Sequence, residues 1–243
     1  MARFLINGGV ILGLLLSAGS VLAQGAPLQL GPRPAPVTSA PATSPPAANA
    51  PAGQTQPAPP PETPQMLIER INLSLNSMGT LIGDFNQINA DGRRRSGKLY
   101  VMRPGKLRFD YDPLSQLEVV SDGSQVAVID KRVPQQDLYG IGQTPLKFLV
   151  AEKINIARDT KVLGVVREKD EVILDIEDKN TIAGTSRIRI HFDGETFMIR
   201  RWTVTDPQGI PTTVQLANLN TQQRPSRSLF TINYQFNVGR QPN

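Results

Sequence analysis

The sequence predicts a mainly β protein, with a long antiparallel sheet that has one apolar face and is joined to two or three helices. Apolar and polar residues alternate over most of the chain after residue 80, for example in 106–112, which is the period of half-buried strands. Turn signals such as Asp193-Gly194 separate these runs. Helical spacing is confined to two short stretches. Such a sheet must curl around its helices or close as a barrel to bury its apolar face.

The first 23 residues predict a signal peptide. Arg3 supplies a basic start, and the apolar stretch that follows is too short for a stable membrane span. Val21-Leu22-Ala23 fits the end of a cleavage site, so we expect cleavage after Ala23 and export to the periplasm. An uncleaved anchor is the alternative. A lipoprotein carries an acylated cysteine at its mature N-terminus. Here that position is Gln24 and the chain has no cysteine, so we expect that the protein is not itself a lipoprotein.

Residues 24–64 form a Pro/Ala-rich segment with 13 prolines, in which only Arg33 and Glu62 are charged. Proline removes backbone donors and the segment has few large apolar side chains, so we expect it to be disordered, with extended polyproline stretches. Its role is either a spacer across the periplasm or a tail without a partner. The folded domain is then expected to span 65–243.

Two helices are expected. The first begins with Thr63 as N-cap and Pro64 in the first turn, and it ends at Gly79. Its apolar positions recur at helical spacing: Ile68, Ile71, Leu75 and Met78. The second begins with Thr144 as N-cap and Pro145 in the first turn. Its apolar positions are Leu146, Leu149 and Val150.

The strands follow one another with short connections, which require an antiparallel meander. In the run 106–112, Leu107, Phe109 and Tyr111 alternate with charged residues. The expected strands are 80–90, 97–103, 106–112, 115–121, 125–131, 161–168, 171–178, 184–193, 196–206 and 211–220.

Composition excludes several kinds of site. Without cysteine there is no disulfide, thiol nucleophile or thiolate metal site, and the single histidine, His191, rules out a multi-histidine centre. We interpret His191 as an ordinary surface residue. The chain also lacks a nucleophile elbow and a Gly-rich phosphate loop. We therefore expect no catalytic residue, no metal and no cofactor.

The formal net charge is +5, but the basic residues are not interleaved with exposed aromatic residues, so we expect no nucleic-acid partner. Arg93-Arg94-Arg95 lies on an expected hairpin tip. It either docks on anionic lipid headgroups or an acidic partner, or it serves as a solubilising turn.

The segment Gly97–Tyr111 resembles a motif of the periplasmic lipoprotein carrier family LolA: glycine, leucine and an aromatic residue, then Arg-Pro and an apolar strand. Further similarities follow in the family's order, over about 66–236. They are Phe85-Asn86-Gln87, Ser121-Asp122-Gly123, Gln143-Thr144-Pro145-Leu146, the hairpin 188–213 and Phe230-Thr231-Ile232.

The resemblance implies an incomplete, strongly curved antiparallel β-barrel with a helical lid over an apolar cavity. It also implies a non-enzymatic, monomeric carrier that binds the acyl chains of lipoproteins. Such a carrier receives its cargo from an inner-membrane ATP-driven transporter and delivers it to an outer-membrane acceptor. A related alternative is an accessory module that uses the same barrel to bind lipids or to sense lipoproteins.

The family's functional arginine falls on Arg103, which shares strand parity with Leu99 and Val101. A charge on that apolar face needs hydrogen bonds. We expect Arg103 to bond helix backbone carbonyls and to hold the lid shut until cargo displaces it. The alternative is that Arg103 turns out to solvent. The expected cavity wall consists of Leu99, Val101, Leu107, Phe109 and Tyr111, and the expected lid residues are Ile68, Ile71, Leu75, Leu146 and Leu149.

Overall fold

The computed structural model describes residues 62–132, 135–181 and 183–235. The expected signal peptide and most of the Pro/Ala-rich segment lie outside the described residues. At the start of the described part, Glu62 forms ion pairs with Arg70 and with Arg167, whose Nε lies 2.5 Å from Glu62 Oε2. No helix within the described residues is long and apolar enough to cross a membrane.

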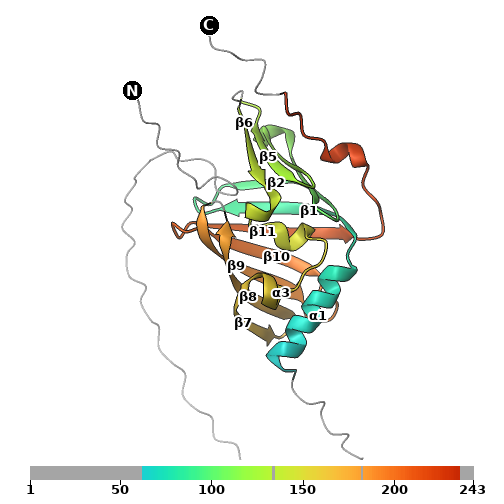
Figure 1. Ribbon diagram of the computed structural model, residues 1–243, viewed down its shortest axis with the longest axis vertical. Helices are drawn as coiled ribbons and strands as arrows, with labels where there is room; N and C mark the ends of the chain where they lie inside the picture. The colour runs from blue at the N-terminus through green and yellow to red at the C-terminus, as the bar shows by residue number, and fades with distance from the viewer. Residues whose placement is uncertain (1–61, 133–134, 182, 236–243) are drawn as a thin grey trace, which may run out of the picture. The chain divides into compact units, whose positions relative to one another are not determined.

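The described part of the chain contains one open antiparallel sheet of eleven strands (Figure 1). The strands are β1 (Thr80–Asn89), β2 (Arg94–Met102), β3 (Lys106–Tyr111), β4 (Leu117–Asp122), β5 (Gln125–Asp130), β6 (Gln135–Gly140), β7 (Lys161–Glu168), β8 (Glu171–Thr181), β9 (Gly184–Asp193), β10 (Ile199–Thr205) and β11 (Pro211–Asn220). Their order is β6-β5-β4-β3-β2-β1-β11-β10-β9-β8-β7. Two meanders therefore meet where β1 pairs with β11, and β6 and β7 are the free edges.

The sheet is strongly curved. Phe109 on β3 and Trp202 on β10 lie four strands apart in the sheet order, which corresponds to about 19 Å in a flat sheet. Their ring centroids are only 6.5 Å apart. The apolar face is therefore concave, and the sheet order leaves it unclosed between β6 and β7. This confirms the expected incomplete, curved antiparallel architecture.

The strands expected from the sequence are present, most of them with boundaries that differ by a few residues. Strand β6 was not expected, because its sequence Gln-Gln-Asp-Leu-Tyr-Gly lacks apolar alternation. It pairs only with β5, and an edge strand with one neighbour needs no apolar pattern. Strand β10 begins at Ile199 rather than at 196, because Phe197 adopts a left-handed conformation (φ 56°) in the preceding turn.

Helix α1 (Pro64–Ser77) begins as expected, with the Thr63 side chain accepting a hydrogen bond from the Met66 backbone N–H at 3.3 Å. Its buried apolar residues, however, are Leu67, Ile71 and Leu75. Ile68 is half-buried and packs against the edge of the core. The buried positions 67, 71 and 75 are four residues apart, so they form one row along the helix, and this row packs into the core.

Helix α2 (Lys147–Val150) begins later than expected. Thr144 does not cap it, because a 3-10 helix over Ile141–Gln143 precedes it and the Thr144 hydroxyl donates to the Ile141 carbonyl at 2.9 Å. Helix α3 (Ile156–Asp159) was not expected, since four residues are too few to show a period. Helices α1 and α3 lie over the same face of the sheet as one another and contact β7 (Figure 1).

Candidate functional site: an apolar interior and its lid

The concave face carries an apolar cluster that contains the residues expected to form the cavity wall. Leu99, Val101 and Leu107 are fully buried, and Phe109 and Tyr111 are nearly so. All five belong to one core cluster that also contains four of the five expected lid residues, namely Ile71, Leu75, Leu146 and Leu149. In this arrangement the lid side chains fill the hollow of the sheet, so any ligand could reach it only by displacing them.

A chain of aromatic contacts connects the sheet to the lid. Phe109 lies edge-on to Phe85, with ring centroids 5.0 Å apart, and also contacts Trp202. Trp202 in turn contacts Phe148 of α2 at 6.0 Å. Sequence reasoning did not assign Trp202 to the site, although its alternation with Val204 in the strand pattern places both on the apolar face. As the only tryptophan in the chain, Trp202 is a natural probe of the interior.

One end of the concave face is polar. The Tyr111 hydroxyl donates to Gln87 Oε1 at 2.6 Å, and Gln87 Nε2 donates to Asn89 Oδ1 at 2.8 Å. Burial raises the pKa of Tyr111, so the hydroxyl keeps its proton and its role as donor. Tyr111 therefore offers an apolar ring to the interior and a satisfied polar end to this side chain network.

Arg103 lies directly after β2, and its guanidinium reaches the C-terminal end of α1. Nη1 donates to the carbonyl of Leu75 and, at 3.4 Å, to that of Met78. The Arg103 backbone N–H also donates to the Gly79 carbonyl at 2.9 Å. These carbonyls stand at the negative end of the helix, where a cation is favoured. The alternative orientation into solvent is thus not the one adopted.

The environment of Arg103 is costly for a charge. Burial lowers the pKa of its guanidinium, although arginine remains protonated at neutral pH. Nε and Nη2 are buried and have no hydrogen-bond partner among the described residues. A partly unsatisfied buried cation weakens the closed state relative to a fully bonded one. Arg103 therefore bonds the end of α1 through one guanidinium nitrogen, Nη1, while the other two nitrogens lack partners among the described residues.

Helix α2 is attached to the sheet at two points. Lys147 Nζ lies 2.8 Å from Oδ2 of Asp178 on β8, whose side chain is almost completely buried. On the other side, the Gly105 backbone N–H in the β2–β3 turn donates to the Val150 carbonyl at 2.8 Å. Helix α2 thus links β8, in one half of the curved sheet, to the β2–β3 turn in the other half.

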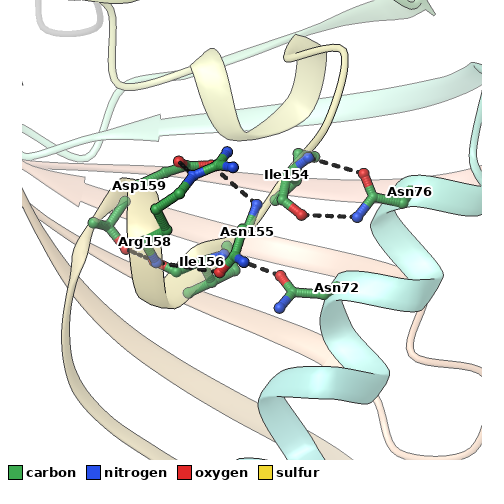
Figure 2. Close-up of polar contacts among 8 residues, drawn as sticks. Asn72, Asn76, Ile154, Asn155, Ile156, Arg158 and Asp159 are labelled. Atoms are coloured by element: carbon green, nitrogen blue, oxygen red, sulfur yellow. Dashed lines mark hydrogen bonds and ion pairs between the residues drawn. The ribbon is translucent and has the colours of Figure 1, made fainter.

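Two asparagines of α1 bind the segment that leads into α3 (Figure 2). Asn76 pairs reciprocally with Ile154: Nδ2 donates to the Ile154 carbonyl at 2.8 Å, and Oδ1 accepts from the Ile154 N–H at 2.9 Å. Asn72 Oδ1 accepts from the Ile156 N–H at 3.0 Å. The sequence alone assigns neither asparagine a role. Their spacing of four residues places them on one side of α1 but does not reveal a backbone partner.

A pocket of about 590 Å³ lies beside the lid. Its lining comes from the β2–β3 and β4–β5 turns, α2, α3 and the end of β8, and includes Pro104, Phe148, Ile154, Ile156, Lys147 and Asn180. None of the expected cavity-wall residues lines it. The pocket therefore opens between the lid elements, while the expected wall is sealed beneath them.

The structure also places the single histidine, His191, and the basic hairpin tip. His191 is not an ordinary surface residue, because it is only 9% exposed and its Nδ1 lies 2.8 Å from Glu171 Oε2. Arg201, opposite His191 on β10, has Nη2 3.0 Å from His191 Nδ1 and also binds Glu171 at 3.0 Å. Arg93 pairs with Asp91 at 3.3 Å on the hairpin tip. Within the described ranges, no group of three or more His, Cys, Asp or Glu side chains could hold a metal ion.

Comparison with known proteins gives a consistent set of relatives. A model of the family described as outer membrane lipoprotein carrier protein LolA matches residues 76–233. An outer-membrane lipoprotein carrier protein of Legionella pneumophila (strain Lens) is 27% identical over 178 residues, which is 70% of this chain and 86% of the relative. One from Methylococcus capsulatus is 36% identical over 99 residues, covering 37% of this chain and 46% of the relative.

Among solved structures, a LolA superfamily protein from Nitrosomonas europaea matches with a TM-score of 0.38 and 11% identity, covering 69% of this chain and 98% of that one. An outer membrane lipoprotein-sorting protein domain from Vibrio parahaemolyticus, described as putative, matches with a TM-score of 0.40 and 11% identity, over 71% and 96% of the two chains.

The match to the family model extends from the end of α1 past β11 and so includes Arg103 and the whole sheet. The family consists of periplasmic, non-enzymatic carriers, and its cargo is lipoprotein. The prediction of a carrier rather than an enzyme is thereby confirmed. The chain belongs to the LolA family of outer membrane lipoprotein carrier proteins.

Proposed function

We propose that this protein binds the acyl chains of lipoproteins released by an inner-membrane ATP-driven transporter and delivers them to an outer-membrane acceptor. Its expected signal peptide, cleaved after Ala23, would bring it to the periplasm. The observation that carries the proposal is the concave apolar face sealed by helices, with the charged Arg103 bonded to the end of α1. A sealed apolar interior without convergent catalytic groups suits a lipid.

The mechanism we propose uses two states. In the closed state, Ile71 and Leu75 of α1 fill the interior, and Arg103 holds the helix end. Acyl chains replace these lid side chains, so apolar area is buried in both states and the free-energy difference between them stays small. The bonds of Arg103 favour the closed, empty state and so oppose retention of the cargo. In this mechanism Leu99, Val101, Leu107, Phe109 and Tyr111 line the acyl-chain site.

Native mass spectrometry tests the carrier function directly. The protein is isolated from the periplasm of its own cells and is expected to carry acylated polypeptide at one molecule per monomer. A control variant with a charge in the interior, such as Leu107→Glu, should lose this bound species if it still folds, as judged by circular dichroism. Purification with free lipid only, and never with acylated polypeptide, would favour a lipid-binding module over a lipoprotein carrier.

A further inference from the structure

Helix α1 and segment 154–156 are joined by side-chain hydrogen bonds and not by apolar contact alone. Helix α1 uses its last turn to bind Arg103, through the Leu75 and Met78 carbonyls. The adjacent flank of the same helix binds residues 154–156 through Asn72 and Asn76 (Figure 2). Leu75, which accepts one of the bonds from Arg103, directly precedes Asn76 in the helix. Since a helix is stiff over one turn, a displacement of its end must reach both asparagines.

The segment 154–156 depends on these asparagines. The Ile154 and Ile156 side chains are buried in the core, at 5% and 1% exposure. Among the described contacts, the partners of their backbone N–H groups are the Oδ1 atoms of Asn76 and Asn72. If α1 moved away alone, two backbone donors at a part-buried site would lose those partners, which is unfavourable. The lower-cost path is for the segment to move with the helix.

We propose that Asn72 and Asn76 are positioning residues that couple segment 154–156 to α1, so that this segment opens together with α1 when Arg103 releases the helix. This inference rests on the proposed carrier function, because the coupled movement serves to admit and release cargo. It also locates the opening, because Ile154 and Ile156 line the pocket beside the lid, and a joint movement would extend that pocket into the apolar interior.

Hydrogen exchange at the Ile154 and Ile156 amides, measured on the purified full chain without cargo, tests the coupling. Arg103→Leu is expected to speed exchange at both amides and in α1, by about tenfold for the loss of one charge-assisted bond. In the Asn72→Ala/Asn76→Ala background, exchange at the two amides should already be raised about three- to tenfold. There, Arg103→Leu should speed exchange in α1 but add nothing at 154–156.

Two variants separate coupling from a general loss of stability. Asn72→Asp keeps the acceptor for the Ile156 N–H, so it should preserve the response to Arg103→Leu, whereas Asn72→Ala should weaken it. Ser74→Ala removes a different bond from the same helix, that of the Ser74 hydroxyl to the Phe197 carbonyl at 2.8 Å. It should leave the response at 154–156 intact.

The coupling is wrong if Arg103→Leu speeds exchange in α1 while the Ile154 and Ile156 amides stay as protected as in the wild type. It is equally wrong if Arg103→Leu changes neither segment, because α1 then does not depend on Arg103. The carrier function is judged separately, by binding of a synthetic triacylated lipopeptide to the wild type. Failure of that binding would leave the exchange result standing and would reject the carrier function alone.

Discussion

Replacing Arg103 by leucine should separate loading from release. The substitution removes the bond from Nη1 to the Leu75 carbonyl, while the second contact, to Met78 at 3.4 Å, is too long to add much. A hydrogen bond to a charged group contributes about 1.5–3 kcal/mol. Its loss lowers the ratio of closed to open lid by roughly 10- to 150-fold. The two unpartnered nitrogens of the guanidinium favour the lower end of this range.

Leucine also adds an apolar side chain next to the lid, and acyl burial is favourable by about 0.8 kcal/mol per methylene. Both effects stabilise the loaded form. The Arg103→Leu variant should therefore accept lipoprotein as the wild type does, but release it more slowly by at least about tenfold.

The assay is transfer of a radiolabelled lipoprotein from the purified complex to outer-membrane vesicles. Arg108→Leu is the matched control, because Arg108 is also a part-buried arginine but pairs with Glu118 at 2.9 Å instead of with the lid. It should release cargo at the wild-type rate. Equally fast release from Arg103→Leu would remove Arg103 from the mechanism and leave its contact with α1 a structural one.

Three further predictions follow from single features. Phe109→Glu places a carboxylate in the sealed interior and should weaken binding of a lipid-like fluorescent probe; unchanged affinity in a variant that circular dichroism shows to be folded would put Phe109 outside the site. Deleting residues 24–61 should leave the melting temperature of the domain almost unchanged, whereas a loss of several degrees would mean that this segment docks on it. Burial raises the pKa of Asp122, but hydrogen bonds from the Tyr234 hydroxyl at 2.6 Å and from the loop after β4 outweigh it and lower the pKa to about 2. The depressed value means that Asp122 stabilises the fold above about pH 4 and loses this contribution as the pH falls toward 2; the stability difference between wild type and Asp122→Asn, from thermal melts, should shrink over that interval, and a constant difference would contradict the assignment.

The sequence by itself determined the local structure. Alternation of apolar and polar residues located nearly every strand and its buried face, because side chains alternate sides along an extended backbone whatever its neighbours are. Thr63 marked the start of α1 for a similarly local reason, since an N-cap bonds a backbone N–H three residues away. Strand parity also placed Arg103 beside the apolar residues Leu99 and Val101, and so next to the lid.

Only the tertiary structure decided how these pieces meet. The pairing of β1 with β11 joins residues 80–89 to residues 211–220, and no short-range pattern records such a contact. Curvature then brings Trp202 against Phe109, which in a flat sheet would lie well apart. The bonds from Asn72 and Asn76 to segment 154–156 join side chains to backbone, and backbone groups are the same at every residue. Such partners leave no periodicity in the sequence, so they become visible only when the chain has folded.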